Sequence, residues 1–178
     1  MLQLTVDGRE IYDESTMGFI SVSPCILQLE HSLISLAKWE SRWHKPFLTN
    51  DPKTFEELLD YVKCMTLNKN IDPNIYLCLT QEHFDAINSY IQDPMTATTI
   101  NKKSGRSSRK IITSEVIYYW MIASEIPFEC EKWHLNRLMT LIEVCSAEAN
   151  PTKMSKSEIR KQNAAINAAR RAKTGSRG

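Results

Sequence analysis

The stretch MLQLTVDGREIY (residues 1–12) decides the fold class, because apolar and polar residues alternate through it. Leu2, Leu4 and Val6 fall on one face of a predicted strand. Asp7–Gly8 is a dipeptide typical of tight turns, so the first strand is expected to form a hairpin with a return strand that begins at the following Ile-Tyr pair. A second extended segment is expected over Phe19–Leu29, where a proline indicates an edge position or a bulge.

The rest of the chain carries the signals of helices. Ser32 is placed to cap a first helix, and Thr54-x-x-Glu57 forms a capping box before a second. The expected helices are Leu33–Trp43, a helix after the Thr54 box, a helix after Thr80, a helix after Thr113 that contains Ile117–Ile122, and Glu131–Ala147. A short strand region followed by helices predicts an α+β fold.

Two of these helices differ in their pattern. The run Ile117–Ile122 is apolar nearly all round, which predicts a position in the centre of the domain. In Glu131–Ala147 the apolar residues form one stripe that faces the core. The stripe consists of Leu135, Leu138, Met139, Ile142 and Cys145.

Charge is distributed unevenly along the chain. Residues 151–178 contain eight Lys or Arg and one Glu, and Asn101–Lys110 contains five basic residues and no acid. Because the whole chain carries only +1, residues 1–150 carry −6. We therefore expect a globular α+β body over 1–150 and a basic C-terminal helical tail over 151–178, whose helix begins at a Ser155-x-x-Glu158 capping box.

Composition favours a reduced, intracellular protein. The five cysteines are odd in number and show no CxxC spacing, so neither a disulfide framework nor a zinc site is indicated. The N-terminal segment lacks the pattern of a signal peptide. No apolar stretch approaches the length of a membrane span, so a membrane partner is not expected.

Residue types that carry chemistry are present without the spacing that catalysis needs. Cys130 and His134 are four residues apart and would share a helix face, but two ligands make only half of a zinc site. The segment around Gly105 lacks the GxxxxGK pattern of a phosphate loop. The chain contains no GxSxG or HExxH motif. We therefore expect no cofactor, no metal site and no enzymatic activity.

Two kinds of binding remain open. The basic tail could neutralise nucleic-acid phosphates, but it has no aromatic residue to stack on bases, so an acidic protein surface is the preferred partner. Trp39 and Trp43 lie four residues apart, so both face one side of a helix, where core packing is favoured over an exposed interface.

Several segments resemble the small tail assembly chaperones of tailed bacteriophages. The resembling segments are LEHSLISLAKWESRWHKPFL (29–48), DYVKCMT (60–66), DPMTATT (93–99), IITSEVIYYWMIASEIPFECEKWHLNRLMTLI (111–142) and MSKSEIRKQNAAINAARR (154–171). The resemblance implies a non-enzymatic protein of the host cytoplasm that binds the tape-measure protein and tail-tube subunits. It also implies a possible frameshifted longer form.

The same resemblance, together with the charge of the tail, suggests which residues contact partners. The candidate partner-binding residues are Trp39, Trp43, Lys45, Phe47, Trp133, His134, Arg137, Arg160, Lys161, Arg170 and Arg171. Self-association is a further possibility. The alternatives are a virion structural protein of the tail or head–tail region and a nucleic-acid-binding accessory protein.

Overall fold

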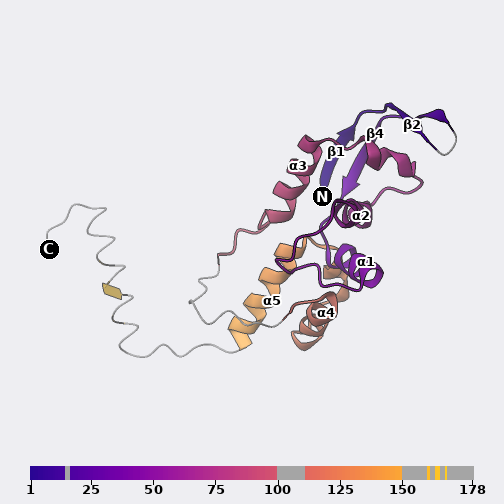
Figure 1. Cartoon of the computed structure of the whole chain (residues 1–178). Coiled ribbons are helices and arrows are strands. Elements are labelled where there is room, and N and C mark those ends of the chain that lie inside the picture. Colours follow the sequence, from indigo (N-terminus) through magenta and orange to yellow (C-terminus); the bar gives the residue numbers. More distant parts are fainter. Residues whose placement is uncertain (15–16, 100–110, 150–159, 161–162, 165–166, 168–178) are drawn as a thin grey trace. The chain divides into compact units, whose positions relative to one another are not determined.

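The computed structural model describes residues 1–14, 17–99, 111–149, 160, 163–164 and 167 (Figure 1). The chain divides into two compact units, Met1–Val144 and Cys145–Gly178. The described residues of the second unit are all helical. The capping box predicted at Ser155–Glu158 lies outside the described residues, as does the basic loop Asn101–Lys110. The first unit is an α+β fold, as predicted.

Within the described residues, four strands form two separate antiparallel pairs. Strand β1 (Leu2–Val6) pairs with β4 (Cys25–Leu29), and β2 (Glu10–Asp13) pairs with β3 (Gly18–Ser21). In the first pair Leu4 lies opposite Leu27, and alternate side chains of both strands face the core. The alternation predicted for residues 2–6 is thus confirmed.

The predicted hairpin between residues 2–6 and the segment at Ile11 is wrong. The turn at Gly8 leads into a strand that pairs with β3 instead, and the backbone of Val22 donates to the carbonyl of Arg9 over 3.0 Å. A Cβ on Gly8 would collide with the carbonyl oxygen of Val22, so glycine is required where the two strand pairs meet. The predicted extended segment Phe19–Leu29 is divided into β3 and β4, with Pro24 between them.

The helices begin where their caps predict. Helix α1 (Leu33–Trp43) follows Ser32, whose hydroxyl accepts from the backbone of Ser35. Helix α2 (Phe55–Met65) has the complete capping box of Thr54 and Glu57. The remaining helices are η1 (Pro73–Cys78), α3 (Gln81–Gln92) after Thr80, α4 (Ser114–Ala123) after Thr113, η2 (Phe128–Lys132) and α5 (Leu135–Ala149).

Two predictions about the later helices need correction. Helix α4 is only partly buried: Ile117 and Met121 are inaccessible, whereas Tyr119 and Ile122 are 63% and 61% exposed. The helix predicted from Glu131 begins at Leu135, because the preceding residue His134 forms an antiparallel bridge with Ser32. Such a bridge needs extended backbone, which delays the start of α5.

The core of the first unit lies between the β1–β4 pair and helices α1, α2 and α3. Its largest buried side chains include Trp39, Tyr61 and Met65. Helix α1 packs against both α2 and α4 and lies between them in Figure 1. The backbone after α2 covers the outer edge of β4, where Leu67 donates to the carbonyl of Gln28 over 2.8 Å. In the part of the chain that the structure describes, no helix has the length and apolarity needed to cross a membrane.

Candidate functional site

Aromatic rings from the segment 29–48 assemble at the end of α1. The rings of Trp39 and Trp43 stack with centroids 6.1 Å apart, and Phe47 packs edge-on against Trp39 at 5.0 Å. Phe47 in turn stacks on Tyr61 of α2 at 3.8 Å. Trp39, Trp43 and Phe47, which were predicted to contact partners, therefore pack against one another and against α2. Of these, Trp39 is 1% exposed.

Polar contacts hold these rings in place. The indole N–H of Trp39 donates to the carbonyl of Glu57 over 2.8 Å, and that of Trp43 donates to Asp60 over 2.9 Å. The Lys45 ammonium lies 2.6 Å from Oε1 of Glu57. Its hydrogen bond lowers the pKa of the Glu57 carboxyl, as does the N–H of Thr54 in the capping box. The Lys45 ammonium is thus paired with a buried carboxylate of α2, while 61% of its side chain stays exposed.

Glu40 links the end of α1 to the start of α4. Its Oε1 accepts from the backbone N–H of Phe47 over 2.9 Å, and its Oε2 accepts from that of Ser114 over 2.7 Å. The side chain is buried, and an acidic group at the N-terminus of α4 is also favourable for the helix dipole. One carboxylate therefore ties the end of α1 and the segment after it to the start of α4.

A second connection between these segments is a buried pair of histidines. The rings of His31 and His134 lie edge-to-face with centroids 5.2 Å apart. Nδ1 of His31 lies 2.6 Å from the hydroxyl of Tyr61. Nδ1 of His134 accepts from the backbone of Asn136, which leaves Nε2–H to donate to the carbonyl of Tyr90 over 3.0 Å. Both rings are positioned as neutral imidazoles.

The surroundings of this pair suppress its charge. Burial, followed by the proximity of His134, lowers the pKa of His31 to about 3. Burial also lowers the pKa of His134. The neighbouring Tyr61 is fully enclosed, which raises its pKa, and Tyr90 has a raised pKa because of burial and its 2.6 Å hydrogen bond to Glu30. These side chains form an uncharged, hydrogen-bonded cluster in the core. Cys130 is also buried, and its thiol is free.

The other predicted partner-binding residues lie at different places. Trp133 is half-buried, and the exposed Arg137 guanidinium lies 4.2 Å from the centre of its ring. His134 is 6% exposed, so like Trp39 it cannot contact a partner directly in this structure. Arg160 is helical and exposed. The side chains of Lys161, Arg170 and Arg171 lie outside the described residues.

An apolar groove between α2 and α3 is the surface best suited to a protein partner. It encloses a volume of about 340 Å³. Its floor contains the buried side chains of Tyr61, Val62 and Ile87, while Phe55 and Leu58 on its wall are 66% and 40% exposed. The other lining residues are Phe47, Lys53, Gln81, Phe84, Asn88 and Ile91.

The sequence analysis placed a helix after the Thr54 box but did not single out Phe55 or Leu58, so it missed this groove. Phe55 packs edge-on against Phe84 of α3 with centroids 5.6 Å apart, but both rings remain accessible. Two aromatic rings and a leucine that stay exposed beside one another are typical of an interaction surface. The only indication in the sequence was that Phe55 occupies the first position of its helix, where few core contacts are available.

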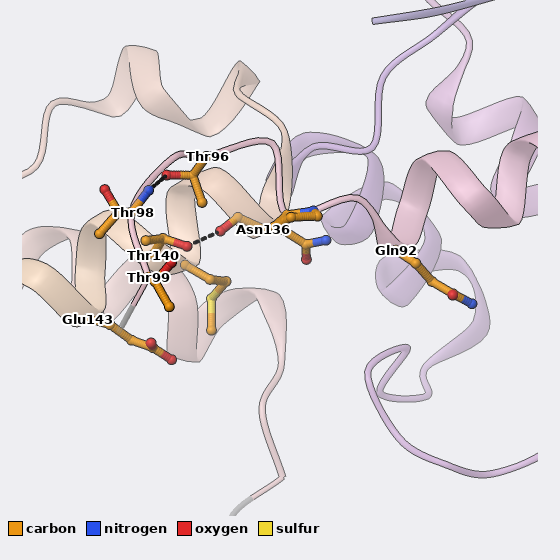
Figure 2. A pocket seen from close by; sticks show the side chains of 9 residues that line it. Gln92, Thr96, Thr98, Thr99, Asn136, Thr140 and Glu143 are labelled. Carbon is orange, nitrogen blue, oxygen red and sulfur yellow. Dashed lines mark hydrogen bonds between the residues drawn. The ribbon is translucent and has the colours of Figure 1, made fainter. Parts of the chain in front are cut away.

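A second hollow, of about 440 Å³, has a polar lining (Figure 2). It lies between the segment after α3 and helix α5, with Thr96, Thr98 and Thr99 on one side and Thr140 and Glu143 on the other. Several of its polar groups bond within the fold. The Thr140 hydroxyl donates to the carbonyl of Asn136 over 2.9 Å, and the Asn136 amide donates to the carbonyls of Ile91, in the last turn of α3, and Asp93, just after it. The bonds of the Asn136 amide fasten the end of α3 to α5.

Among the residues that the structure describes, no group of three or more His, Cys, Asp or Glu side chains is arranged to hold a metal ion. Comparison with protein-family models, curated proteins and solved structures gives no match for this chain. Its function is therefore argued from its own residues.

Proposed function

We propose that this chain is a non-enzymatic tail assembly chaperone of the tailed-bacteriophage type. It would act in the host cytoplasm and bind the tape-measure protein and tail-tube subunits while a tail is built. The observation that carries the proposal is the groove between α2 and α3, where Phe55, Leu58 and Phe84 remain accessible above a buried floor.

The groove has the properties expected of a surface that binds a protein segment. Its lining is mainly apolar, with Lys53, Gln81 and Asn88 as the polar residues that can orient a bound chain. The exposed rings supply apolar area at low cost in side-chain entropy. Two of the resembling segments contribute to it: Phe47 comes from residues 29–48, and Tyr61 and Val62 come from residues 60–66.

Electrostatics would add to this contact. The tail carries +7 and the loop Asn101–Lys110 carries +5, so residues 1–100 and 111–150 together carry −11. The basic segments would bring the chain to an acidic partner and accelerate encounter, while the groove would supply the short-range apolar contact. The long-range attraction would come from basic residues that include Arg160, Lys161, Arg170 and Arg171. The short-range apolar contact would come from the groove.

Co-expression with the tape-measure and tail-tube proteins of the same phage tests the proposal. The wild-type chain should copurify with at least one of them. Leu58→Glu should abolish that complex, because a partner would bury an unpaired carboxylate. Phe19→Glu is the matched control, since Phe19 is 71% exposed on the β2–β3 hairpin and should tolerate the change. Absence of a complex with the wild-type chain, or equal binding by both variants, would contradict the proposal.

The fate of the protein during assembly separates a chaperone from a structural component. A chaperone is present in assembling tails and absent from purified mature particles. An antibody against the chain should therefore detect it in infected cells but not in those particles. Stoichiometric retention in mature particles would instead show a virion structural protein of the tail or head–tail region.

A further inference from the structure

The two helices that form the walls of the groove are anchored to different degrees. Helix α2 buries five of its eleven residues, and the chain that follows it bonds to β4 through Leu67 and Gln28. Helix α3 buries only Ile87 and Tyr90 of its twelve residues. A helix with few buried side chains opens more readily by local unfolding, so α3 is the wall whose position needs further support.

That support comes from the start of α5. The last carbonyls of a helix have no donor within it and need donors from elsewhere. At the end of α3, Nε2–H of His134 donates to the carbonyl of Tyr90 over 3.0 Å. The Asn136 amide donates to the carbonyls of Ile91 and Asp93, over 2.8 Å in each case. Two side chains from another part of the chain therefore cap the C-terminus of α3.

The histidine pair extends this connection to the other wall. The ring of His31 lies against that of His134, and Nδ1 of His31 lies 2.6 Å from the hydroxyl of Tyr61. Tyr61 belongs to α2 and forms part of the groove floor. A line of contacts thus joins α2 to α3 through two imidazoles that do not line the groove themselves.

We propose that His31, His134 and Asn136 are positioning residues that set the distance between the two walls of the groove. They hold α3 at the separation from α2 at which Phe55 and Phe84 meet, with ring centroids 5.6 Å apart. The proposal rests on the proposed function of the groove. It gives His134 a part in partner binding although the ring is only 6% exposed, because the ring acts through α3.

The polar groups of this connection leave α3 little freedom. Nδ1 of His134 accepts from the backbone N–H of Asn136 over 3.3 Å, which fixes the ring and directs Nε2–H at Tyr90. The Tyr90 hydroxyl is bound at the same time to Glu30 over 2.6 Å. Most of these groups are buried or partly buried, where an unmade hydrogen bond is costly. Displacement of α3 must therefore break several bonds together.

Hydrogen exchange on the purified full-length chain tests the positioning role. Asn136→Asp keeps the shape of the side chain but removes both N–H donors and places a carboxylate against two carbonyl oxygens. Amides of residues 87–92 in α3 should then exchange at least about tenfold faster, while those of α2 keep their wild-type rates. The measurement needs no partner, so its outcome is separate from that of the copurification experiment.

Asn68→Asp is the matched control. The Asn68 amide donates to the carbonyl of Ile26 over 3.0 Å, and its Oδ1 accepts from the backbone of Gln28, so the same substitution disturbs the edge of β4 instead of α3. Its effect on exchange should be confined to β4 and the segment after α2. Circular dichroism confirms that both variants are folded. Asn136→Ser, which removes the donors without adding charge, replaces Asn136→Asp if that variant is not.

Binding of tail proteins supplies the second readout. Asn136→Asp should weaken the complex by at least about tenfold, whereas Asn68→Asp should bind like the wild type, although neither residue lines the groove. Three results would overturn the proposal: unchanged exchange in α3 of Asn136→Asp, equal acceleration in α2 and α3, or faster exchange in α3 with full binding. If no tail protein binds the wild-type chain, the proposed function fails, while the exchange rates still decide whether α5 positions α3.

Discussion

Acidification should destabilise this protein through His31. The side chain is 2% exposed, contacts Tyr61 and His134, and has a pKa of about 3 against an ordinary value of 6.5. The folded state therefore disfavours the proton, whereas the unfolded chain binds it near pH 6.5. The stabilising contribution of this neutral histidine is complete above that pH and is lost as the pH falls below it.

The difference in pKa sets the size of the effect. Each pH unit below the unfolded value removes about 1.4 kcal/mol from the free energy of unfolding, so at about pH 4.5 the loss is about 3 kcal/mol. The loss levels off near the folded pKa, at a total of about 5 kcal/mol. This is a large share of the stability of a small domain, which is typically about 5–15 kcal/mol.

Urea denaturation at a series of pH values measures this dependence. In His31→Asn the titrating ring is replaced by a neutral amide that can still reach the Tyr61 hydroxyl. The variant should be less stable at neutral pH, but its stability should fall less steeply below pH 6.5, by about 1.4 kcal/mol per pH unit. Because the comparison is between slopes, the constant cost of lost packing cancels.

The matched control is His44→Asn. His44 is exposed and occupies the left-handed conformation after α1, which asparagine tolerates well. Its pH dependence should equal that of the wild type, with the same contribution from carboxylates in both. The slope that remains in His31→Asn is expected from His134, whose pKa is also lowered, and from the carboxylates. A His31→Asn profile parallel to the wild type would refute the reasoning.

Four further predictions follow from the packing and the charge distribution. Leu138→Ala and Ile142→Ala should each lower the free energy of unfolding by about 2–5 kcal/mol, because both side chains are buried; near-neutral effects would place this stripe at an interface. Glu40→Gln should cost about 1–3 kcal/mol in urea denaturation, since one of two buried backbone N–H groups loses its acceptor; equal stability would mean that solvent replaces it. Deletion of 151–178 should preserve a cooperative thermal transition and weaken partner binding; loss of the transition would show that the tail belongs to the core. Excess DNA or RNA should fail to displace the protein partner from the purified complex, whereas efficient displacement and direct binding to a random duplex would favour a nucleic-acid function.

Helix starts were predictable because their signals are local. Ser32, Thr54 and Thr80 each stand immediately before a helix, and Glu57 completes a box with a residue three positions away. A cap satisfies backbone N–H groups within its own turn, so its effect does not depend on the rest of the fold. The start predicted for α5 was too early because a distant bridge to Ser32 holds His134 extended.

The candidate partner-binding residues were gathered from a resemblance, and their environments could not be read from the chain. Trp39 and Trp43 share a helix side, as their spacing predicted, but the stacking of Phe47 on the distant Tyr61 could not be read from the sequence. The apolar run in α4 predicted burial on every side, but burial requires neighbours, and among the described residues Ile117 and Met121 are buried while Tyr119 and Ile122 stay exposed. Exposure is a property of what packs against a helix, so composition alone misplaced it.

The amino-acid sequence by itself determined the α+β class, the helix starts and the separation of charge between an acidic body and basic segments, because these depend on residues adjacent in the chain. Only the tertiary structure decided that β1 pairs with β4, that His31 meets His134, and that α2 and α3 leave a groove between them. Each of these joins residues far apart in sequence, where many pairings satisfy the same local pattern. The choice among them depends on which arrangement buries the most apolar surface while keeping every buried polar group paired.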